Sequence, residues 1–281
     1  MIATENVTAD ASAPPHGAGL SLGKVVLFWA AYLAILIAAS PLKGSVPERW
    51  GQLVWGTSSA SAILLLTLLF LSRERRSIRE VGLNLEAASV SRFVAGALMG
   101  LTIYGLNVLL VTALTSPIQF TRTGVDAGAV LLAVATFIVL SMMEELGFRG
   151  YSLRTLVPGI GLWKAQGVVA LAFGLSHLAF GWSWVTVLVG VLPNALLFGM
   201  SAVVSRGLAL PIGLHAGINV ARWAAGEKGT PGIWTMSASD QTSGQISAVA
   251  PVVGVAIPLL VSFVMWRWYQ VHLKRASATE G

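Results

Sequence analysis

The chain has 281 residues, of which 55% are hydrophobic and only 11% are charged, and it carries a formal net charge of +6. Soluble domains contain about 25% charged residues. This composition, with a mean hydropathy of +0.76, therefore excludes an ordinary globular protein and predicts an integral membrane protein. Cysteine is absent, which excludes disulfides, thiolate metal sites and a cysteine nucleophile.

A membrane-spanning helix needs roughly 20 mostly apolar residues, and about eight segments of the chain meet that length. In chain order they are 22–40, 52–72, 90–115, 126–146, 164–181, 184–205, 207–224 and 249–270. None alternates polar and apolar residues as barrel strands do, so we expect helices that satisfy their own backbone hydrogen bonds. The predicted fold is all-α: a polytopic transmembrane helix bundle of about eight spans with an internal polar cavity.

The polar ends of the chain are predicted to be tails rather than domains. Residues 1–20 are rich in Ala, Pro, Thr and Gly and are expected to be disordered, and residues 273–281 form a C-terminal tail. Between them, residues 21–272 form one transmembrane helical domain. Its polar segment 225–248, AGEKGTPGIWTMSASDQTSGQISA, is expected to be a loop on the outer side.

Lysine and arginine are unevenly divided between the two sides of the predicted bundle. If the N-terminus is cytoplasmic, most of the 18 basic residues lie in the inner segments, namely Lys24, Arg73, Arg75, Arg76, Arg79, Arg92, Arg149, Arg154, Lys164, Arg206, Arg267, Lys274 and Arg275. The positive-inside rule then predicts that both termini are cytoplasmic. Inner basic loops lie against anionic lipid headgroups, which explains a pI of about 10.1 without a nucleic-acid partner.

Two adjacent carboxylates, Glu144 and Glu145, stand in the segment SMMEELGFRGYSL, directly after a long uncharged stretch. Two of the four histidines, His177 and His215, also lie inside apolar spans, in VALAFGLSHLAFGW and LALPIGLHAGINVA. Ionisable side chains at membrane depth are rare, face the bundle interior and are functional candidates by default. Three separate helices therefore predict one shared polar site.

Counting residues from the predicted span ends assigns each of these side chains a depth. At about 1.5 Å per residue, Glu144 lies about 27 Å from the outer surface of a core roughly 30 Å thick. His215 and His177 lie about 12 Å and about 20 Å from the cytoplasmic side. All three side chains can therefore meet in a cavity that opens toward the cytoplasm.

Helical geometry separates the roles of the two carboxylates, which point about 100° apart. Glu145 and Arg149 are spaced i,i+4 in the favourable order, which predicts a structural ion pair that neutralises Glu145. Glu144 faces elsewhere without that partner, and such a carboxylate can take a proton from water. The alternative for Glu144 is a second structural carboxylate that another helix satisfies.

Each histidine has a partner one helical turn away. Phe173 and His177 share a face in FGLSH, where the phenylalanine is expected to fix the imidazole rotamer; by itself, His177 could equally be a satisfied core residue. His215 and Asn219 share a face in HAGIN, and both can donate hydrogen bonds to a developing oxyanion. The same pair could instead form hydrogen bonds that hold two helices together. The small residues around His215 allow a neighbouring backbone or a substrate to approach closely.

The segments EELGFR, FGLSH and HAGIN stand in the order and approximate separation of the motifs EExxxR, FxxxH and HxxxN. Residues 90–224 therefore resemble the CPBP intramembrane proteases, the family that includes the type II CAAX prenyl endopeptidases and the bacteriocin-immunity-like proteins. The resemblance implies a hydrolase that cleaves peptide bonds within the membrane, with a peptide or membrane-protein substrate that enters from the cytoplasmic leaflet. It implies a water-activating pair, Glu144 and His177, an oxyanion pair, His215 and Asn219, and the supporting residues Glu145, Arg149 and Phe173.

The family is named for metalloproteases, so zinc has to be considered as a cofactor. Glu144, His177 and His215 would supply a His₂Glu set with an open fourth position. However, the chain contains no HExxH motif and no two histidines share a helical turn. We therefore favour a mechanism without a cofactor, with zinc as the alternative.

Two other functions compete with the protease. A non-catalytic membrane immunity or scaffold protein of the same fold would need neither a base nor two oxyanion donors. A proton-coupled transporter would also hold Glu and His inside the membrane. Transporters usually show repeated halves with broken helices in corresponding positions, and the sequence shows neither.

Overall fold

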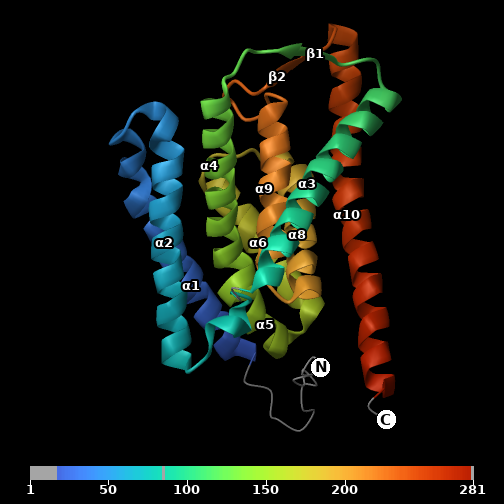
Figure 1. Cartoon of the computed structure of the whole chain (residues 1–281). Helices are drawn as coiled ribbons and strands as arrows, with labels where there is room; N and C mark the ends of the chain where they lie inside the picture. The colour runs from blue at the N-terminus through green and yellow to red at the C-terminus, as the bar shows by residue number, and fades with distance from the viewer. Residues whose placement is uncertain (1–17, 84–85, 280–281) are drawn as a thin grey trace.

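Helices make up most of the protein, as the sequence predicts. The computed structural model describes residues 18–83 and 86–279, and it confirms the all-α class (Figure 1). The helices are α1 (Ala18–Ala39), α2 (Glu48–Glu74), α3 (Ala87–Leu114), α4 (Ala127–Glu145), α5 (Tyr151–Ile160), α6 (Leu162–Ala179), α7 (Trp184–Thr186), α8 (Leu192–Ser205), α9 (Ala209–Ala224) and α10 (Asp240–Thr279). Two π-helical turns, Leu146–Gly150 and Val187–Val191, join α4 to α5 and α7 to α8. Two 3-10 turns, Ser40–Gly44 and Ile78–Val81, follow α1 and α2.

In the described part of the chain, six helical segments are long and apolar enough to cross a membrane. They are Gly19–Gly44, Glu48–Glu74, Ala87–Leu114, Ala127–Ile160, Trp184–Ser205 and Asp240–His272. Each of the predicted spans contains a helix, but two of these helices, α6 and α9, are not among the six long apolar segments. These two helices have 18 and 16 residues, and sixteen residues reach only about 24 Å across a core roughly 30 Å thick. The two helices that carry the histidines are therefore short ones.

The span that carries the carboxylates does not end at them. Helix runs without a break from Ala127 through the π-helical turn and α5 to Ile160, 34 residues in all. Glu144 therefore lies near the middle of this segment, whereas the sequence predicted a span of 126–146. The predicted boundary is wrong because one charged turn, paired inside the protein, does not stop the helix. Apolar residues resume in α5, whose sequence is YSLRTLVPGI.

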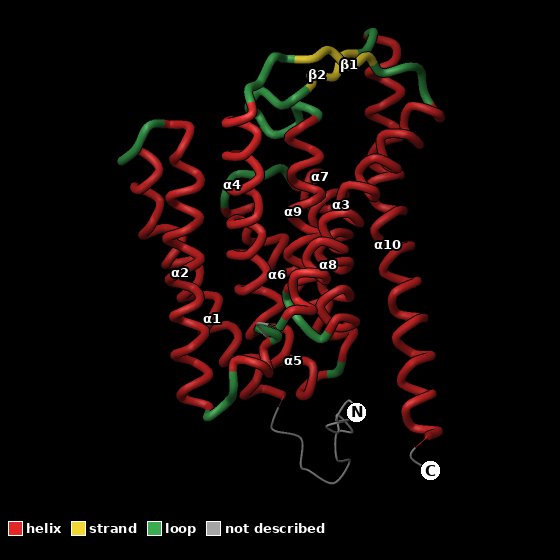
Figure 2. The backbone as a smooth tube through the Cα atoms, viewed as in Figure 1, coloured by secondary structure: helices red, strands yellow, loops and turns green. Residues whose placement is uncertain are grey.

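The start of α1 and the end of α10 lie at the same end of the bundle, the lower end in Figures 1 and 2. The α1–α2 connection lies at the upper end, near strands β1 (Gln119–Arg122) and β2 (Trp234–Ser237), which pair antiparallel. The strands tie the α3–α4 connection to the α9–α10 connection. The sequence predicted no strand, and the predicted loop 225–248 contains β2 and the first turns of α10.

The two predicted tails have different outcomes. Of the N-terminal tail 1–20, residues 1–17 lie outside the described residues and the remainder begins α1. Helix α10 continues to Thr279, so most of the predicted tail 273–281 is helical.

Helices α3 and α9 pack backbone against backbone. A Cβ atom on Gly96 or Gly100 of α3 would collide with carbonyl oxygens of α9. A Cβ atom on Gly213 or Gly217 of α9 would collide with carbonyl oxygens of α3. Paired glycines spaced four residues apart let membrane helices approach this closely. The small residues around His215 therefore admit a neighbouring backbone, one of the two partners that the sequence allowed.

Helix α1 packs against the π-helical turn that follows the carboxylates. The ring of Tyr32 lies directly over Gly147, where a Cβ atom would come 2.5 Å from a ring carbon. The indole Nε1 of Trp29 donates a hydrogen bond to the carbonyl oxygen of Gly147 at 3.3 Å. Because Gly147 is only two residues beyond Glu145, these contacts hold α1 beside the carboxylates.

Replacing Gly100 by leucine should separate α3 from α9 and lower the free energy of unfolding by about 1–3 kcal/mol, the usual cost of overpacking. Reversible unfolding of the purified protein in mixed detergent measures this change. The matched control is Gly105→Leu on the same helix, because a Cβ atom at Gly105 meets no neighbour within 4 Å. Equal stability of the two variants would show that the close approach does not hold α3 and α9 together.

Candidate active site

Glu144 is the less enclosed of the two adjacent carboxylates. Its side chain is 22% exposed, whereas the side chain of Glu145 is fully buried. Oε2 of Glu144 lies 3.7 Å from Nε2 of His215, and it has no hydrogen-bond partner among the described residues. Because Oε2 itself is shielded from solvent, the exposed fraction of the side chain belongs to its other atoms, and Glu144 lines the neighbouring cavity.

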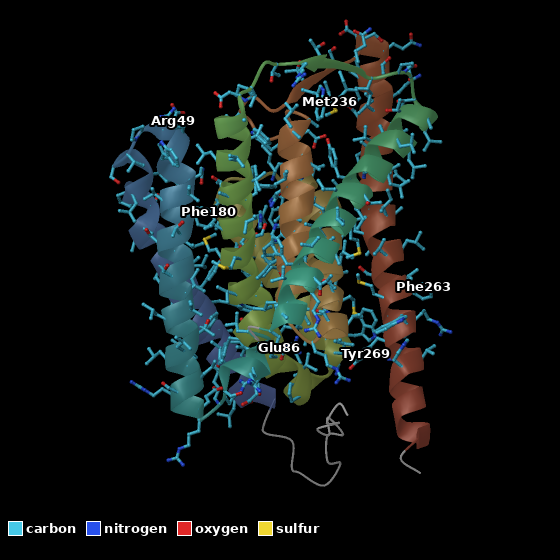
Figure 3. The ribbon with its side chains drawn as sticks, in the orientation of Figure 1. Arg49, Glu86, Phe180, Met236, Phe263 and Tyr269 are labelled. Carbon is cyan, nitrogen blue, oxygen red and sulfur yellow. The ribbon has the colours of Figure 1, made fainter. Side chains whose placement is uncertain are left out.

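A cavity of about 340 Å³ lies beside Glu144, between α1, α2, α4 and α6. Its lining includes Tyr32, Gln52, Trp55, Glu144, His177 and Trp182. The structure thus brings Glu144 and His177 to the same space, as the sequence predicts. The space is large enough for several water molecules at about 30 Å³ each. The cavity reaches the surface at the exposed residues Gln52 and Phe180, and Figure 3 shows Phe180 between α2 and α4.

Glu145 is the centre of a buried charge cluster. Its Oε1 lies 3.2 Å from Nη1 of Arg149 and 2.9 Å from Nδ1 of His215. The predicted i,i+4 ion pair is therefore present, with both of its side chains 0% exposed. Nη2 of Arg149 donates a second hydrogen bond, to the carbonyl oxygen of Ala195 on α8, at 3.0 Å. Burying a charge costs several kcal/mol per ion unless it is paired, so each member of this cluster depends on the others.

One buried ring, Phe173 of α6, contacts three members of the candidate site. Its centroid lies 4.6 Å from that of His177 and 6.3 Å from that of His215. The guanidinium carbon of Arg149 lies 4.4 Å from the same centroid, a cation–π distance. Phe173 therefore sets the spacing between the two histidines and covers the buried ion pair.

The hydrogen bond of His177 defines its neutral tautomer. Nδ1 of His177 lies 2.9 Å from the carbonyl oxygen of Phe173. A carbonyl oxygen only accepts hydrogen bonds, so Nδ1 must carry the proton. In the neutral imidazole, Nε2 is then unprotonated and can accept a proton. The indole of Trp182, perpendicular to the imidazole with centroids 4.8 Å apart, packs against the same ring.

His215 is held by two contacts, and its second ring nitrogen points to Glu144. Nδ1 faces the carboxylate of Glu145 at 2.9 Å, which orients that nitrogen as a donor. Its ring stacks on Phe198 of α8, with centroids 4.3 Å apart and an interplanar angle of 18°. Nε2 is therefore free to accept a hydrogen bond when His215 is neutral, or to donate one when the ring is doubly protonated. Glu145 selects this geometry, as the orienting carboxylate does in Ser-His-Asp triads.

Asn219 is the predicted site residue that neither makes a hydrogen bond in the described structure nor lines a cavity. It lies one turn after His215 on α9 and is half-buried. Its amide makes no hydrogen bond within the described residues, and it lines neither of the two cavities described here.

The predicted zinc ligands do not form a metal site as they are placed. Within residues 18–83 and 86–279, no group of three His, Asp or Glu side chains is arranged to hold a metal ion. Glu144 and His177 line one cavity, whereas His215 is not part of its lining and its Nδ1 is occupied by Glu145. The residues therefore do not fit a three-ligand zinc centre, and no catalytic step is derived through one.

Several residues that line the cavity lie outside the three sequence motifs. Tyr32, Gln52 and Trp55 reach the cavity from α1 and α2, and Trp182 reaches it from the turn between α6 and α7. These segments precede or follow the motif helices in sequence. The available sequence signal for these residues is that a polar or aromatic side chain stands near the end of an apolar span. Because aromatic residues are common at membrane interfaces, this signal does not single them out as site residues.

The cavity lies toward the upper end of the bundle in Figure 1, since its lining extends to Lys43 and Gln52 at the α1–α2 connection. The start of α1 and the end of α10 lie at the opposite end. The sequence predicted both cytoplasmic termini and a cavity open to the cytoplasm, whereas the cavity entrance and the described ends of the chain lie at opposite ends of the bundle. Which of these ends faces the cytoplasm stays a prediction.

Residues 126–221 match the family model described as Type II CAAX prenyl endopeptidase Rce1-like. This segment begins at α4 and ends within α9, so it contains every residue of the three motifs. This match supports membership of the CPBP family, which the motifs indicated. Together, the match and the six apolar helices indicate an integral membrane protein, and the match supports an intramembrane-protease fold. No curated protein and no solved structure matches the chain.

Removing one partner of the buried ion pair should destabilise the protein more than removing both. Arg149→Met leaves Glu145 buried without its cation and should lower the free energy of unfolding by about 3–5 kcal/mol. In the double variant with Glu145→Leu, the loss should be well below the sum of the two single losses. Unfolding in mixed detergent measures all three.

The control for this set of variants is Glu80→Gln, which removes the charge of Glu80 from its ion pair with Arg76. In that pair the side chain of Glu80 is 51% exposed. Exposed pairs contribute about 0–1 kcal/mol. Additive losses for the Glu145 and Arg149 variants would contradict a coupled buried pair.

Proposed function

We propose that this protein is an intramembrane endopeptidase that hydrolyses a peptide bond in the cavity beside Glu144. One observation carries the proposal: Glu144, which makes no hydrogen bond within the described residues, lines the same cavity as His177, whose Nε2 can accept a proton. Membership of the CPBP family supports it. The proposed substrate is a peptide or the membrane segment of a protein.

The reaction needs only water as a co-reactant. A water molecule between Glu144 and His177 gives a proton to Glu144 while its oxygen attacks the scissile carbonyl carbon. The electron pair of the C=O bond moves to oxygen and forms a tetrahedral oxyanion. When the C–N bond breaks, the proton passes from Glu144 to the leaving nitrogen, so one water yields a carboxyl group and an amine. We propose that this route proceeds without a metal.

Stabilisation of the oxyanion is assigned to α9. Doubly protonated His215 would donate from Nε2 while Glu145 holds Nδ1, which makes Glu145 a positioning residue. Asn219, one turn away, is proposed as the second donor, since its amide has no other partner in the described structure. Removing one oxyanion donor typically reduces kcat by about 10²–10³-fold.

We propose that substrate enters from the end of the bundle that carries the α1–α2 connection. The cavity reaches exposed residues there. If the positive-inside prediction is correct, this end faces away from the cytoplasm.

Because the chain has no cysteine, single cysteines can report this orientation. Ser45→Cys, at the α1–α2 connection, should react with a membrane-impermeant maleimide added to intact spheroplasts of a bacterial host. Ser72→Cys, in the last turn of α2, should react only after the membrane is permeabilised. Both serines are exposed in the structure. The reverse pattern would put the cavity entrance on the cytoplasmic side.

Replacing Glu144 by glutamine should reduce cleavage by about 10²–10⁴-fold, the usual contribution of a general base. The measurement compares membrane peptides from cells that express wild type, Glu144→Gln or His177→Ala, and an uncleaved substrate should accumulate in both variants. The control is Glu48→Gln, at an exposed carboxylate in the first turn of α2.

Both catalytic variants must insert and unfold like wild type for this comparison to hold. Identical membrane peptides in all four strains, with all four proteins folded, would rule out the protease. Retained biological function in Glu144→Gln would favour the immunity or scaffold alternative.

A further inference from the structure

A second cavity, of about 400 Å³, adjoins the first at the upper end of α9. It is lined by Gly181, Trp182, Thr186, Arg222, Glu227 and Lys228. Trp182 lines both cavities, so its indole is the boundary between them. The ring that packs against His177 on one side therefore borders a separate charged chamber on the other.

Two of the three charged groups in this chamber neutralise each other. Nε of Arg222 lies 2.9 Å from Oε2 of Glu227. The other oxygen of Glu227 accepts a hydrogen bond from the hydroxyl of Tyr104 at 2.8 Å. Both oxygens of Glu227 are thus occupied, and neither contacts Lys228.

Lys228 has no ion-pair or hydrogen-bond partner anywhere in the described structure. Its ammonium instead lies among aromatic rings, 5.7 Å from the centroid of Phe137 and 5.9 Å from that of Trp182. Burial, and then the charge of Arg222, lower the pKa of Lys228 to about 8. An uncompensated ammonium in such a site is costly, so a partner supplied from outside the chain would relieve it.

The charge of the proposed catalytic carboxylate reaches this ammonium. The negative charge of Glu144 acts on Lys228 and opposes the lowering of its pKa. Phe137 lies seven residues before Glu144, two turns along the same face of α4. A peptide that places its scissile bond beside Glu144 can therefore extend past Trp182 to Lys228.

We propose that Lys228 forms an anion subsite that binds a carboxylate group of the peptide substrate, on the far side of Trp182 from the scissile bond. The inference rests on the proposed endopeptidase function and adds a substrate class to it: peptides with a negative charge near the cleavage site. The carboxylate comes either from a free C-terminus or from an Asp or Glu side chain. A charge-assisted hydrogen bond to the ammonium supplies the selectivity.

Three synthetic peptides test this subsite. All have the same apolar sequence with a fluorescent N-terminal label; one ends in a free carboxylate, one in an amide, and one in an amide with a single internal glutamate. Binding is measured by fluorescence polarisation to full-length Glu144→Gln protein in detergent, so that no peptide is cleaved. At least one acidic peptide should bind about tenfold or more tightly than the neutral one. The acidic peptide that binds more tightly identifies the source of the carboxylate.

The variant Lys228→Met preserves the packing of the aliphatic chain and removes the charge. It should abolish the preference for the acidic peptide and leave the affinity for the neutral amide within about twofold. The matched control is Lys43→Met, because Lys43 is the cation that lines the first cavity, where its ammonium lies 3.9 Å from the centroid of the Trp55 ring. Lys43→Met should retain the preference.

The preference should also weaken as the pH rises from 7 to 9, because Lys228, with a pKa of about 8, loses its positive charge. The charged groups that act on it are Glu144 of α4, Arg222 of α9 and Glu227 of its own loop. The Glu144→Gln protein lacks the first of these, which raises the pKa of Lys228, so in that protein the preference should be lost at a lower pH than the wild-type pKa implies. Carboxylates and guanidinium groups ordinarily titrate well outside that range. A preference that does not change up to pH 9 would point to Arg222 instead and overturn the assignment.

Equal binding of the three peptides, or a preference that survives Lys228→Met or disappears in Lys43→Met, would also overturn the subsite. These outcomes are distinct from failure of the proposed function. Glu144-dependent cleavage without any preference for acidic peptides would leave the protease and remove the subsite. A Lys228-dependent preference without Glu144-dependent cleavage would leave an anion site without the protease.

Discussion

The buried charge cluster of Glu145, Arg149 and His215 is the constraint on which the rest of this bundle depends. A carboxylate far from water is tolerated only if it is paired and hydrogen-bonded. Its partners come from the following helical turn and from α9, and Arg149 also binds the carbonyl oxygen of Ala195 on α8. Satisfying one charge therefore sets the positions of α4, α8 and α9. On the opposite side of α9 from His215, paired glycines bring α3 directly against the helix.

The same cluster gives the two adjacent carboxylates different roles. Glu145 holds the ion pair and orients His215, whereas Glu144 faces the cavity. A π-helical turn directly follows them, and such turns occur frequently at functional sites. The tight backbone at Gly147 lets Tyr32 of α1 pack against this turn and close one wall of the cavity. A structural charge and a candidate catalytic charge can thus occupy neighbouring positions because the helix turns them in different directions.

Two chambers meet at Trp182, which joins the candidate catalytic centre to the unpaired ammonium of Lys228. One side of the indole packs against His177, whose free ring nitrogen can accept a proton. The other side borders a cation without a partner in the described structure. An apolar wall between a basic group and an anion-binding group allows both to keep their charge states, because it limits water and separates their charges. Substrate binding and bond cleavage would then use two adjoining cavities that share Trp182 in their linings.

The sequence by itself determined the all-α membrane class, the three motifs and the spacing that pairs Glu145 with Arg149. These follow from composition and helical periodicity, which are local properties. Only the tertiary structure decided that His215 turns toward Glu145, that the helix continues past Glu144, and that the cavity lies away from the chain ends. It also decided that Lys228 lies beside Trp182, since no pattern links a loop residue to a turn so distant in the chain. Such contacts depend on how helices pack, and packing depends on the shapes of many side chains at once.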